Sequence, residues 1–223
     1  TLWQELCQQR KNSYPFTFDR ENTDEIKPQR LIEKIGEMTK GQAYVATDVG
    51  QHQMWVAQYY PFNFGRQIIT SGGLGTMGYG IPAGIGVQFA HPDKEVIVFV
   101  GDGGFQMTNQ ELAILNEFQL NVKFILINNS SLGMVRQWQE SFHGNRRSAS
   151  VFTNHPDFIK LAEAYGIKGT KLSNPATFEA ELEEAFTYKG PQLIEVVVSS
   201  SEHVLPMIPS GMPNHKMIGV KGQ

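Results

Sequence analysis

The stretch Val96-Ile97-Val98-Phe99-Val100-Gly101-Asp102-Gly103-Gly104 decides the fold that the sequence predicts. Its apolar part is continuous and rich in β-branched residues, so we expect a strand over 95–100 that is covered on both faces. A half-exposed strand would instead alternate polar and apolar residues. We interpret 43–47, 122–127 and 192–198 as further strands of the same sheet. Strands that are buried on both faces are typical of parallel sheets.

Segments with helical spacing of apolar residues separate these strands. Before the first strand, Pro28 suits the first turn of a helix and Gly41 supplies a stop signal after it. We expect helices over 28–39, 79–89, 109–118, 157–165 and 176–186. The alternation of strands and helices predicts an α/β fold with a doubly wound, mainly parallel sheet that carries helices on both faces.

The sequence pattern divides the chain into a linker, a domain and an arm. We interpret 1–27, which is polar and contains turn signals, as an interdomain linker or N-terminal extension. The domain covers 28–198, and the aperiodic segment 199–223 is expected to form an irregular C-terminal arm or lid. The chain starts at Thr1 without an initiator Met or a signal-peptide pattern, so we expect a fragment of a longer protein.

Composition excludes several classes of function. The 223 residues include 19 basic and 22 acidic side chains, a net charge of −3, which favours neither nucleic acid nor an anionic membrane surface. No apolar run approaches the roughly 20 residues that cross a bilayer. Cys7 is the single cysteine, which excludes an intramolecular disulfide and a cysteine-based metal site. We therefore expect a reducing compartment, either the cytoplasm or an organelle interior.

Polar residues follow three of the predicted strands at the point where each strand ends. Asp102 follows 95–100 in a glycine-rich turn whose backbone N–H groups can approach an anion. Asn128-Asn129-Ser130-Ser131 follows 122–127, and Asp48-Val49-Gly50-Gln51-His52 follows 43–47. The carboxyl ends of parallel strands form one ligand-binding edge. A carboxylate, neutral oxygens and phosphate oxygens are ligands that magnesium accepts, so this edge is a candidate diphosphate–metal site.

The spacing of two of these segments makes the pattern more specific. Gly103 and Asn128 are separated by 24 residues, which just accommodate one crossover helix and a return strand. A lone Gly-Asp-Gly is a common turn, and paired Asn residues alone carry little information. At this spacing, however, Gly101-Asp102-Gly103 and Asn128-Asn129 resemble the thiamine diphosphate and metal signature of thiamine-dependent enzymes.

Four further motifs resemble one family within that class, acetohydroxyacid synthase (acetolactate synthase), catalytic subunit. They are Gly50-Gln51-His52-Gln53-Met54-Trp55, Thr70-Ser71-Gly72-Gly73-Leu74-Gly75-Thr76-Met77-Gly78, Gly133-Met134-Val135-Arg136-Gln137-Trp138-Gln139 and Ile208-Pro209-Ser210-Gly211. The resemblance starts near Pro28 and runs to the C-terminus. It covers only that family's C-terminal, diphosphate-binding domain.

The resemblance implies the residues that bind the metal and the cofactor. Asp102 and Asn129 would ligate Mg²⁺ through side-chain oxygens, and Ser131 through its backbone carbonyl. Many relatives carry Ser at the position of Gly104, so one hydroxyl contact would be missing here. The thiamine diphosphate contacts implied by the resemblance are Gln51, His52, Gly75, Met77, Gly103, Gly104, Asn129, Gly133 and Met134.

The resemblance also implies catalytic and FAD contacts. Met77 would pack under the bent cofactor, and Trp138 would shape the pocket for the second substrate; these two residues form the predicted catalytic set. Gly72 and Gly73 would contact the FAD that the full-length biosynthetic enzymes carry. The arm over 202–216 would close over the site.

The resemblance implies a reaction that the whole subunit performs. Members of the family decarboxylate pyruvate on thiamine diphosphate and condense the product with pyruvate or 2-ketobutyrate, in branched-chain amino acid biosynthesis. The implied partners are a second copy in a homodimer or tetramer, and a small regulatory subunit. The glutamate that hydrogen-bonds the pyrimidine ring lies in the family's N-terminal domain, so the chain alone is predicted to be inactive.

Two alternatives stay open from the sequence. The chain could be a domain of another thiamine diphosphate enzyme, such as a pyruvate oxidase, a decarboxylase or a catabolic acetolactate synthase. It could also be a non-catalytic assembly module that contributes half of a site to a complex.

Overall fold

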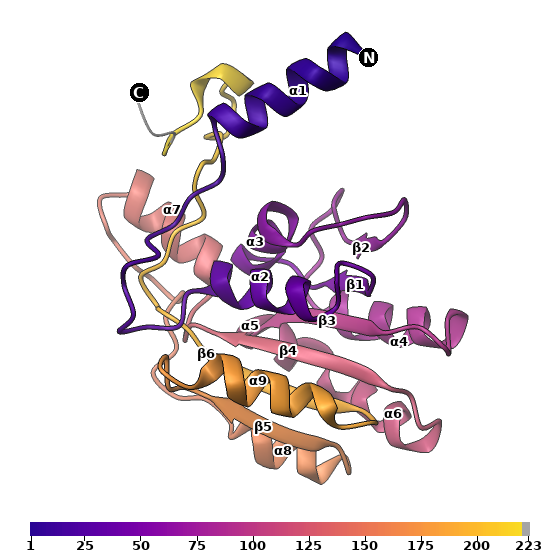
Figure 1. Ribbon diagram of the computed structural model, residues 1–223. Coiled ribbons are helices and arrows are strands. Elements are labelled where there is room, and N and C mark those ends of the chain that lie inside the picture. Colours follow the sequence, from indigo (N-terminus) through magenta and orange to yellow (C-terminus); the bar gives the residue numbers. More distant parts are fainter. Residues whose placement is uncertain (220–223) are drawn as a thin grey trace. The chain divides into compact units, whose positions relative to one another are not determined.

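The computed structural model describes residues 1–219 of the chain (Figure 1). These residues form two compact units. The larger unit is Thr23–Glu202 and holds the whole sheet. The smaller unit combines Thr1–Asn22 with the described part of the segment that begins at His203. The domain boundaries near 28 and 198 stay predictions.

The larger unit is built on a sheet of six strands, which pair in parallel throughout and lie in the order β2-β1-β3-β4-β6-β5. The strands are β1 Tyr44–Thr47, β2 Ile68–Thr70, β3 Val96–Gly101, β4 Val122–Asn128, β5 Lys168–Leu172 and β6 Gln192–Val197. Because Thr47 pairs with Phe99 and Gly101 with Ile127, the carboxyl ends of β1, β3 and β4 are neighbours. The predicted parallel α/β fold is confirmed.

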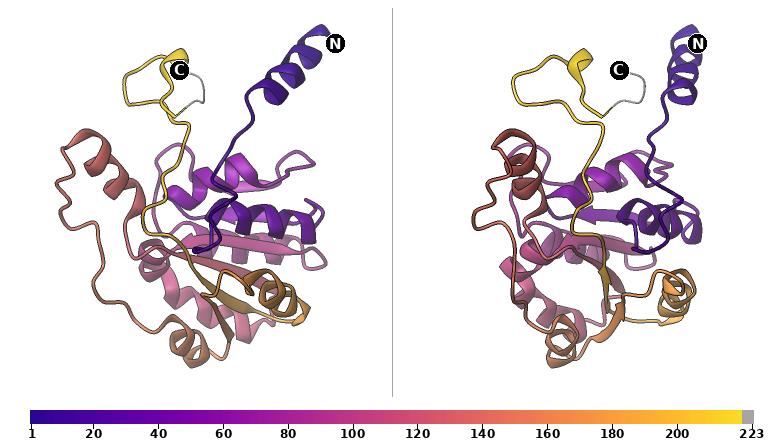
Figure 2. Two further views of the ribbon diagram at one scale, coloured as in Figure 1. Left: turned by 60° about the vertical axis from the view of Figure 1, so that its left-hand side comes forward. Right: turned by 90° about the vertical axis from the view of Figure 1, so that its left-hand side faces the viewer.

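Helices cover both faces of the sheet (Figure 2). In the larger unit they are α2 Pro28–Met38, α3 Gln51–Tyr59, α4 Gly80–Ala90, α5 Asp102–Thr108, α6 Ala113–Glu117, α7 Gly133–Phe142, α8 Phe158–Ala164 and α9 Phe178–Thr187, together with the 3₁₀ turn η1 Asn109–Leu112. Helix α2 starts at Pro28, as predicted, since proline lacks the N–H that a first helical turn leaves unbonded.

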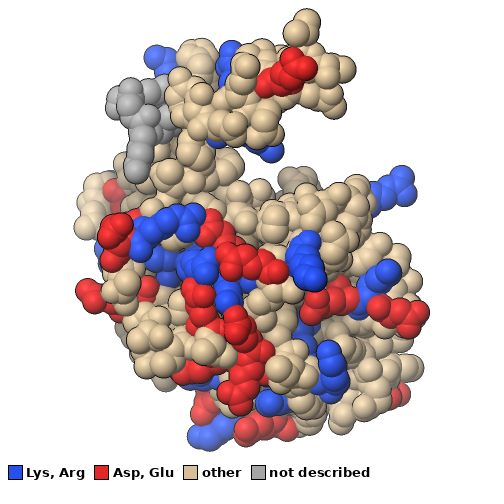
Figure 3. All heavy atoms as spheres, viewed as in Figure 1, with Lys and Arg blue, Asp and Glu red and all other residues tan. Residues whose placement is uncertain are grey.

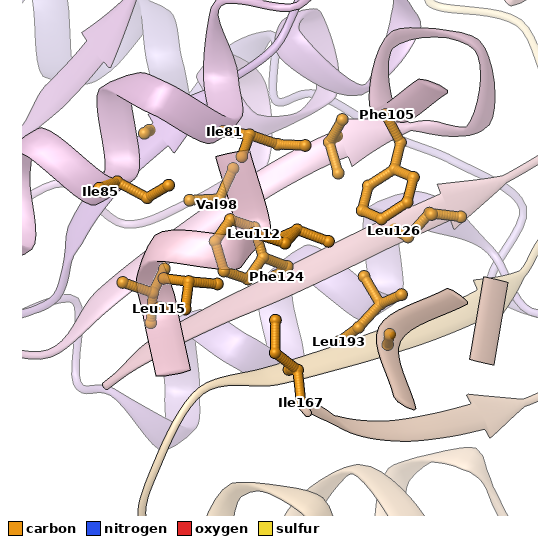
Figure 4. Close-up of a cluster of buried hydrophobic side chains, with 14 of the residues drawn as sticks. Ile81, Ile85, Val98, Phe105, Leu112, Leu115, Phe124, Leu126, Ile167 and Leu193 are labelled. Carbon is orange, nitrogen blue, oxygen red and sulfur yellow. The ribbon is translucent and has the colours of Figure 1, made fainter. Parts of the chain in front are cut away.

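The main hydrophobic core lies between one face of the sheet and helices α4, α5, α6 and α8 (Figure 4). Val98 of β3 and Phe124 of β4 point into it, packed near Ile81 and Phe105. The alternate residues of β3 and β4 face the opposite side of the sheet and are also buried; they include Ile97, Phe99, Ile125 and Ile127. Burial on both faces is the physical reason for the continuous apolar runs.

Ion pairs join α2 and α9 on the opposite side of the sheet. Arg30 Nε lies 2.7 Å from Glu179 Oε1, and Lys34 pairs with Glu183. On the face shown in Figure 3, acidic and basic side chains are interspersed, so this face carries no extended field of one sign.

Two strands and three helices of the larger unit were missed by the sequence pattern. Strand β5 is at the edge of the sheet and contains Lys168 and Lys171, so it lacks an apolar run; β2 has only three residues. Helices α3, α5 and α7 begin at the functional motifs, whose glycine and amide residues hide the helical period. The predicted helix over 109–118 is divided into η1 and α6.

The glycine-rich segment after β3 differs from the predicted turn. Asp102 is the first residue of α5, and Gly103 and Gly104 are inside the helix with ordinary negative φ angles. These glycines therefore do not supply a left-handed turn. They are required by close packing instead, because an added Cβ would lie 2.6 Å from Leu132 Cδ2 at Gly103 and 2.2 Å from Asp48 Oδ1 at Gly104.

The smaller unit contains a helix that the sequence pattern missed. Helix α1, Leu2–Ser13, lies within the predicted linker and buries none of its residues, so it has no apolar periodicity to detect. A reciprocal capping box between Thr1 and Gln4 starts it. In the C-terminal segment, Met207 and Ile218 form an antiparallel bridge, and Asn214–Lys216 forms the 3₁₀ turn η2. Over residues 1–219, the helices are all too short or too polar to cross a membrane.

Candidate cofactor and metal site

A cavity of about 250 Å³ opens at the carboxyl ends of β1, β3 and β4. This is the edge at which the sequence predicted a ligand site, and ligands of parallel α/β sheets bind at such edges. Most of the predicted site residues line it, namely Gln51, His52, Gly75, Met77, Asp102, Gly103, Gly104, Asn129, Ser131, Gly133 and Met134. The topology therefore brings together residues that are far apart in sequence.

Asp102 supplies a buried carboxylate with an unused oxygen. The residue is 1% exposed, and its Oδ1 accepts a hydrogen bond of 3.0 Å from the Gly103 N–H. Its Oδ2 is buried without a hydrogen-bond partner in the described part of the chain, although His155 Nε2 lies 3.4 Å away. Burial raises the pKa of Asp102 to about 7, against the opposing effect of nearby backbone N–H groups. A buried carboxylate with an unpaired oxygen is suited to a cation.

Asn129 and Ser131 lie beside this carboxylate at the end of β4. Asn129 Oδ1 accepts hydrogen bonds of 3.2 Å from both the N–H and the Oγ–H of Ser131. Its Nδ2 donates to Gln51 Oε1 at 3.0 Å. Within residues 1–219 no cluster of three or more His, Cys, Asp or Glu side chains could hold a metal. One carboxylate with neutral oxygens fits magnesium, which usually keeps phosphate and water ligands as well.

Asp48 ties the loop that carries Met77 to the end of β1. Its side chain is fully buried and accepts hydrogen bonds from the N–H groups of Gly78, at 3.1 Å, and Gly80, at 2.8 Å. A Cβ at Gly80 would lie only 2.5 Å from the Asp48 backbone nitrogen. The sequence showed Asp48 after the strand but did not assign it a role. The feature of the sequence that could have indicated this role is a carboxylate that directly follows a buried strand. The glycine N–H groups that bind this carboxylate lie about 30 residues later in the chain.

His52 presents an unpartnered nitrogen beside the cavity. The residue is 6% exposed, and its Nε2 is buried without a hydrogen-bond partner among residues 1–219. Burial lowers the pKa of His52 to about 4, and the Asp48 carboxylate offsets only part of this effect. His52 is therefore neutral at neutral pH, and a neutral imidazole can donate one hydrogen bond to a phosphate oxygen.

His52 gives the chain an acid-sensitive contribution to stability. Its pKa falls from 6.5 to about 4 on folding, so the unfolded chain takes up a proton first as the pH drops. Stability is therefore lost between pH 6.5 and about 4, by at most about 1.4 kcal/mol per pH unit. We expect His52→Gln to remove this part of the pH dependence. Urea unfolding of both proteins at pH 7.5 and about pH 5 measures it; equal pH dependence would contradict the assignment.

Three predicted contacts lie outside the cavity lining. Trp138 is 42% exposed on α7 and packs against Phe142 with ring centroids 6.3 Å apart. Gly72 and Gly73 are in the exposed turn after β2, and a Cβ at Gly73 would meet nothing within 4 Å. The structure therefore leaves their assignment to the second substrate and to FAD as a prediction.

Comparison with known proteins identifies related sequences. The family described as "Thiamine pyrophosphate enzyme, C-terminal TPP binding domain" matches residues 48–196. The acetolactate synthase large subunit of Lactococcus lactis subsp. lactis (strain IL1403) is 60% identical over 218 residues, which are 98% of this chain and 38% of that protein. The acetolactate synthase large subunit of Haemophilus influenzae is 46% identical over 222 residues, 99% of this chain and 38% of that protein.

A third relative has a similar identity and matches a similar share of its length. The acetolactate synthase isozyme 3 large subunit of Escherichia coli (strain K12) is 45% identical over 208 residues, 92% of this chain and 36% of that protein. The chain thus spans little more than a third of the length of these relatives. The family match covers most of the larger unit, including β3, β4 and the segment that directly follows β1. The chain therefore belongs to the thiamine pyrophosphate enzymes and corresponds to their C-terminal cofactor-binding domain.

Proposed function

We propose that this chain is the cofactor-binding domain of an acetolactate synthase large subunit, and that it holds thiamine diphosphate through a magnesium ion. Asp102 and Asn129 provide side-chain oxygens to the ion, and Ser131 provides its backbone carbonyl. The single observation that carries the proposal is the unpartnered, buried Oδ2 of Asp102 in a cavity shared with Asn129. A cation at this oxygen would remove the cost of burying it unpaired.

The other cavity residues bind and orient the cofactor. His52 donates a hydrogen bond from its neutral ring to the diphosphate. Gly103 and Gly104 line the cavity from the first turn of α5, where backbone N–H groups lack intrahelical acceptors. Met77 provides an apolar support, held in place by the Asp48 hydrogen bonds to its loop. When bound, thiamine diphosphate supplies the nucleophilic carbon that acts on the keto group of 2-keto acids.

The activity of the whole subunit is part of the same proposal. The subunit decarboxylates pyruvate and joins the product to pyruvate or 2-ketobutyrate, within a dimer or tetramer that also binds FAD and a small regulatory subunit. The relatives' names favour this reaction over a pyruvate oxidase, a decarboxylase or a non-catalytic assembly module. The pyrimidine-binding glutamate would come from the part of the subunit that this chain does not include, so the chain alone should show no turnover with pyruvate.

Calorimetric titration with thiamine diphosphate, with and without magnesium, tests the binding part of the proposal. We expect magnesium-dependent binding that Asp102→Asn removes, because the amide lacks the charge that holds the ion. Asp93→Asn, at an exposed aspartate in the turn before β3, is the matched control and should bind as the unsubstituted chain does. Equal affinity of the Asp102 variant and the control would contradict the metal assignment.

A further inference from the structure

A buried chain of amide side chains leads from Gln137, in the middle of α7, through Gln51 to the candidate metal ligand Asn129. Gln51 Nε2 donates to Gln137 Oε1 at 2.8 Å and to the Glu202 backbone carbonyl at 3.0 Å. Gln51 Oε1 accepts from Asn129 Nδ2 at 3.0 Å. Gln51 is 2% exposed and Gln137 1% exposed, so water does not compete for these bonds.

The backbone carbonyl of Glu202 fixes the direction of every bond in this chain. A carbonyl oxygen can only accept, so the Gln51 amide must turn its NH₂ group toward Glu202. Its Oε1 then faces Asn129, and because this oxygen can only accept, Asn129 must donate a hydrogen bond from its own NH₂ group. The Asn129 oxygen is thereby directed to the opposite side, toward Ser131. The positions of the heavy atoms alone therefore set both amide orientations.

Glu202 itself is held from two sides. Its carboxylate accepts hydrogen bonds from Lys27 Nζ at 2.8 Å and from Gln29 Nε2 at 2.9 Å. Its backbone carbonyl also accepts from Arg136 Nη2 at 3.1 Å, next to the Gln51 bond. The acceptor that sets the amide directions is therefore fixed by residues of the α2 N-terminus and of α7.

We propose that Gln51 and Gln137 are positioning residues that hold the Asn129 side chain with its oxygen, not its NH₂ group, available to the metal ion. This inference rests on the proposed function, since it takes Asn129 as a metal ligand. A reversed Asn129 amide would present N–H donors to the cation and would lose the bond to Gln51. The Ser131 hydroxyl can rotate away and free one lone pair of the Asn129 oxygen for the ion, while the Ser131 N–H keeps its bond to the same oxygen.

The test replaces Gln137, which does not line the cavity, and compares it with a second glutamine of the same helix. Gln137→Met keeps the length of the side chain and removes the acceptor for Gln51. Gln139→Met is the matched control, because Gln139 bonds to Ser148 and Ser150 and has no bond to the Gln51 chain. Mn²⁺, measured by electron paramagnetic resonance in the presence of thiamine diphosphate, is the probe. Thermal unfolding without the cation serves as the second readout.

We expect Gln137→Met to weaken Mn²⁺ binding by about tenfold or more, in the range seen when partners of metal ligands are removed, with the control within about twofold of the unsubstituted chain. Gln137→Glu, which keeps an acceptor oxygen, should recover part of the affinity. Equal Mn²⁺ affinity in the two methionine variants would overturn the positioning role, even if Gln137→Met lowers the unfolding temperature, since that pattern is purely structural. Failure of the unsubstituted chain to bind Mn²⁺ would overturn the proposed function itself, and the positioning role with it.

Discussion

Gly133→Ala is expected to weaken magnesium-dependent binding of thiamine diphosphate strongly. Gly133 is the first residue of α7, and a Cβ there would lie 2.0 Å from Gln51 Oε1 and 2.7 Å from Asn129 Nδ2. Both atoms are held in the amide chain, so the methyl group cannot fit unless the Gln51–Asn129 hydrogen bond breaks. The displaced Asn129 would no longer offer its oxygen to the ion. We expect a loss of about a hundredfold in affinity, which is the upper end of the effects of disturbed ligand orientation.

The same substitution should not unfold the chain, which separates binding from stability. Gly133 does not have a left-handed backbone, and alanine favours helices over glycine by about 1 kcal/mol. Gly86→Ala is the matched control: it lies within α4, and its added Cβ would meet nothing within 4 Å. We expect unchanged affinity and slightly higher stability for the control. Calorimetric titration measures the affinity, and thermal unfolding measures the stability. Full binding by the Gly133 variant would contradict the tight packing of Gly133 against Gln51 and Asn129 as the cause of the effect.

The fold could be predicted from the sequence where burial controls the pattern. The continuous apolar runs at β3 and β4 marked central strands, because both faces of these strands are covered by helices. Strand β5 was missed for the opposite reason: at the edge of the sheet, Lys168 and Lys171 can reach water, so selection for apolar residues is weak. Helix α1 was missed because it buries no residue, and its capping box is its clearest signal.

The site could be predicted where a motif follows a strand directly. Asp102 and Asn129 were found in this way, since the parallel register places the ends of β3 and β4 side by side. The roles of Asp48 and Gln137 could not be found, because they depend on partners 30 and 86 residues away that only the folded chain brings into contact. Sequence spacing therefore identified candidate ligands, whereas the groups that orient them required side-chain geometry.

Phe105→Ala is expected to cause the largest loss of stability among these substitutions. Phe105 lies on α5, three residues after Asp102, and is fully buried in the core (Figure 4). Its ring packs edge to face on Phe158, with centroids 5.6 Å apart. Removing a buried phenylalanine ring leaves a cavity and costs about 3–5 kcal/mol. Such a loss is a large part of the roughly 5–15 kcal/mol that stabilises a typical domain.

The effect of Phe105→Ala should reach the candidate metal site as well. Asp102 begins the short helix that Phe105 anchors to the core, so a loosened α5 no longer holds the carboxylate in one place. Phe89→Ala is the control: Phe89 is 50% exposed on α4 and its ring packs on the exposed ring of Phe118, so a loss of about 1 kcal/mol or less is expected. Urea unfolding gives the two free energies, and titration with magnesium and thiamine diphosphate below the unfolding range gives the affinities. If the Phe105 variant lost stability but bound the cofactor normally, the position of Asp102 would be set by β3 alone and not by the packing of α5.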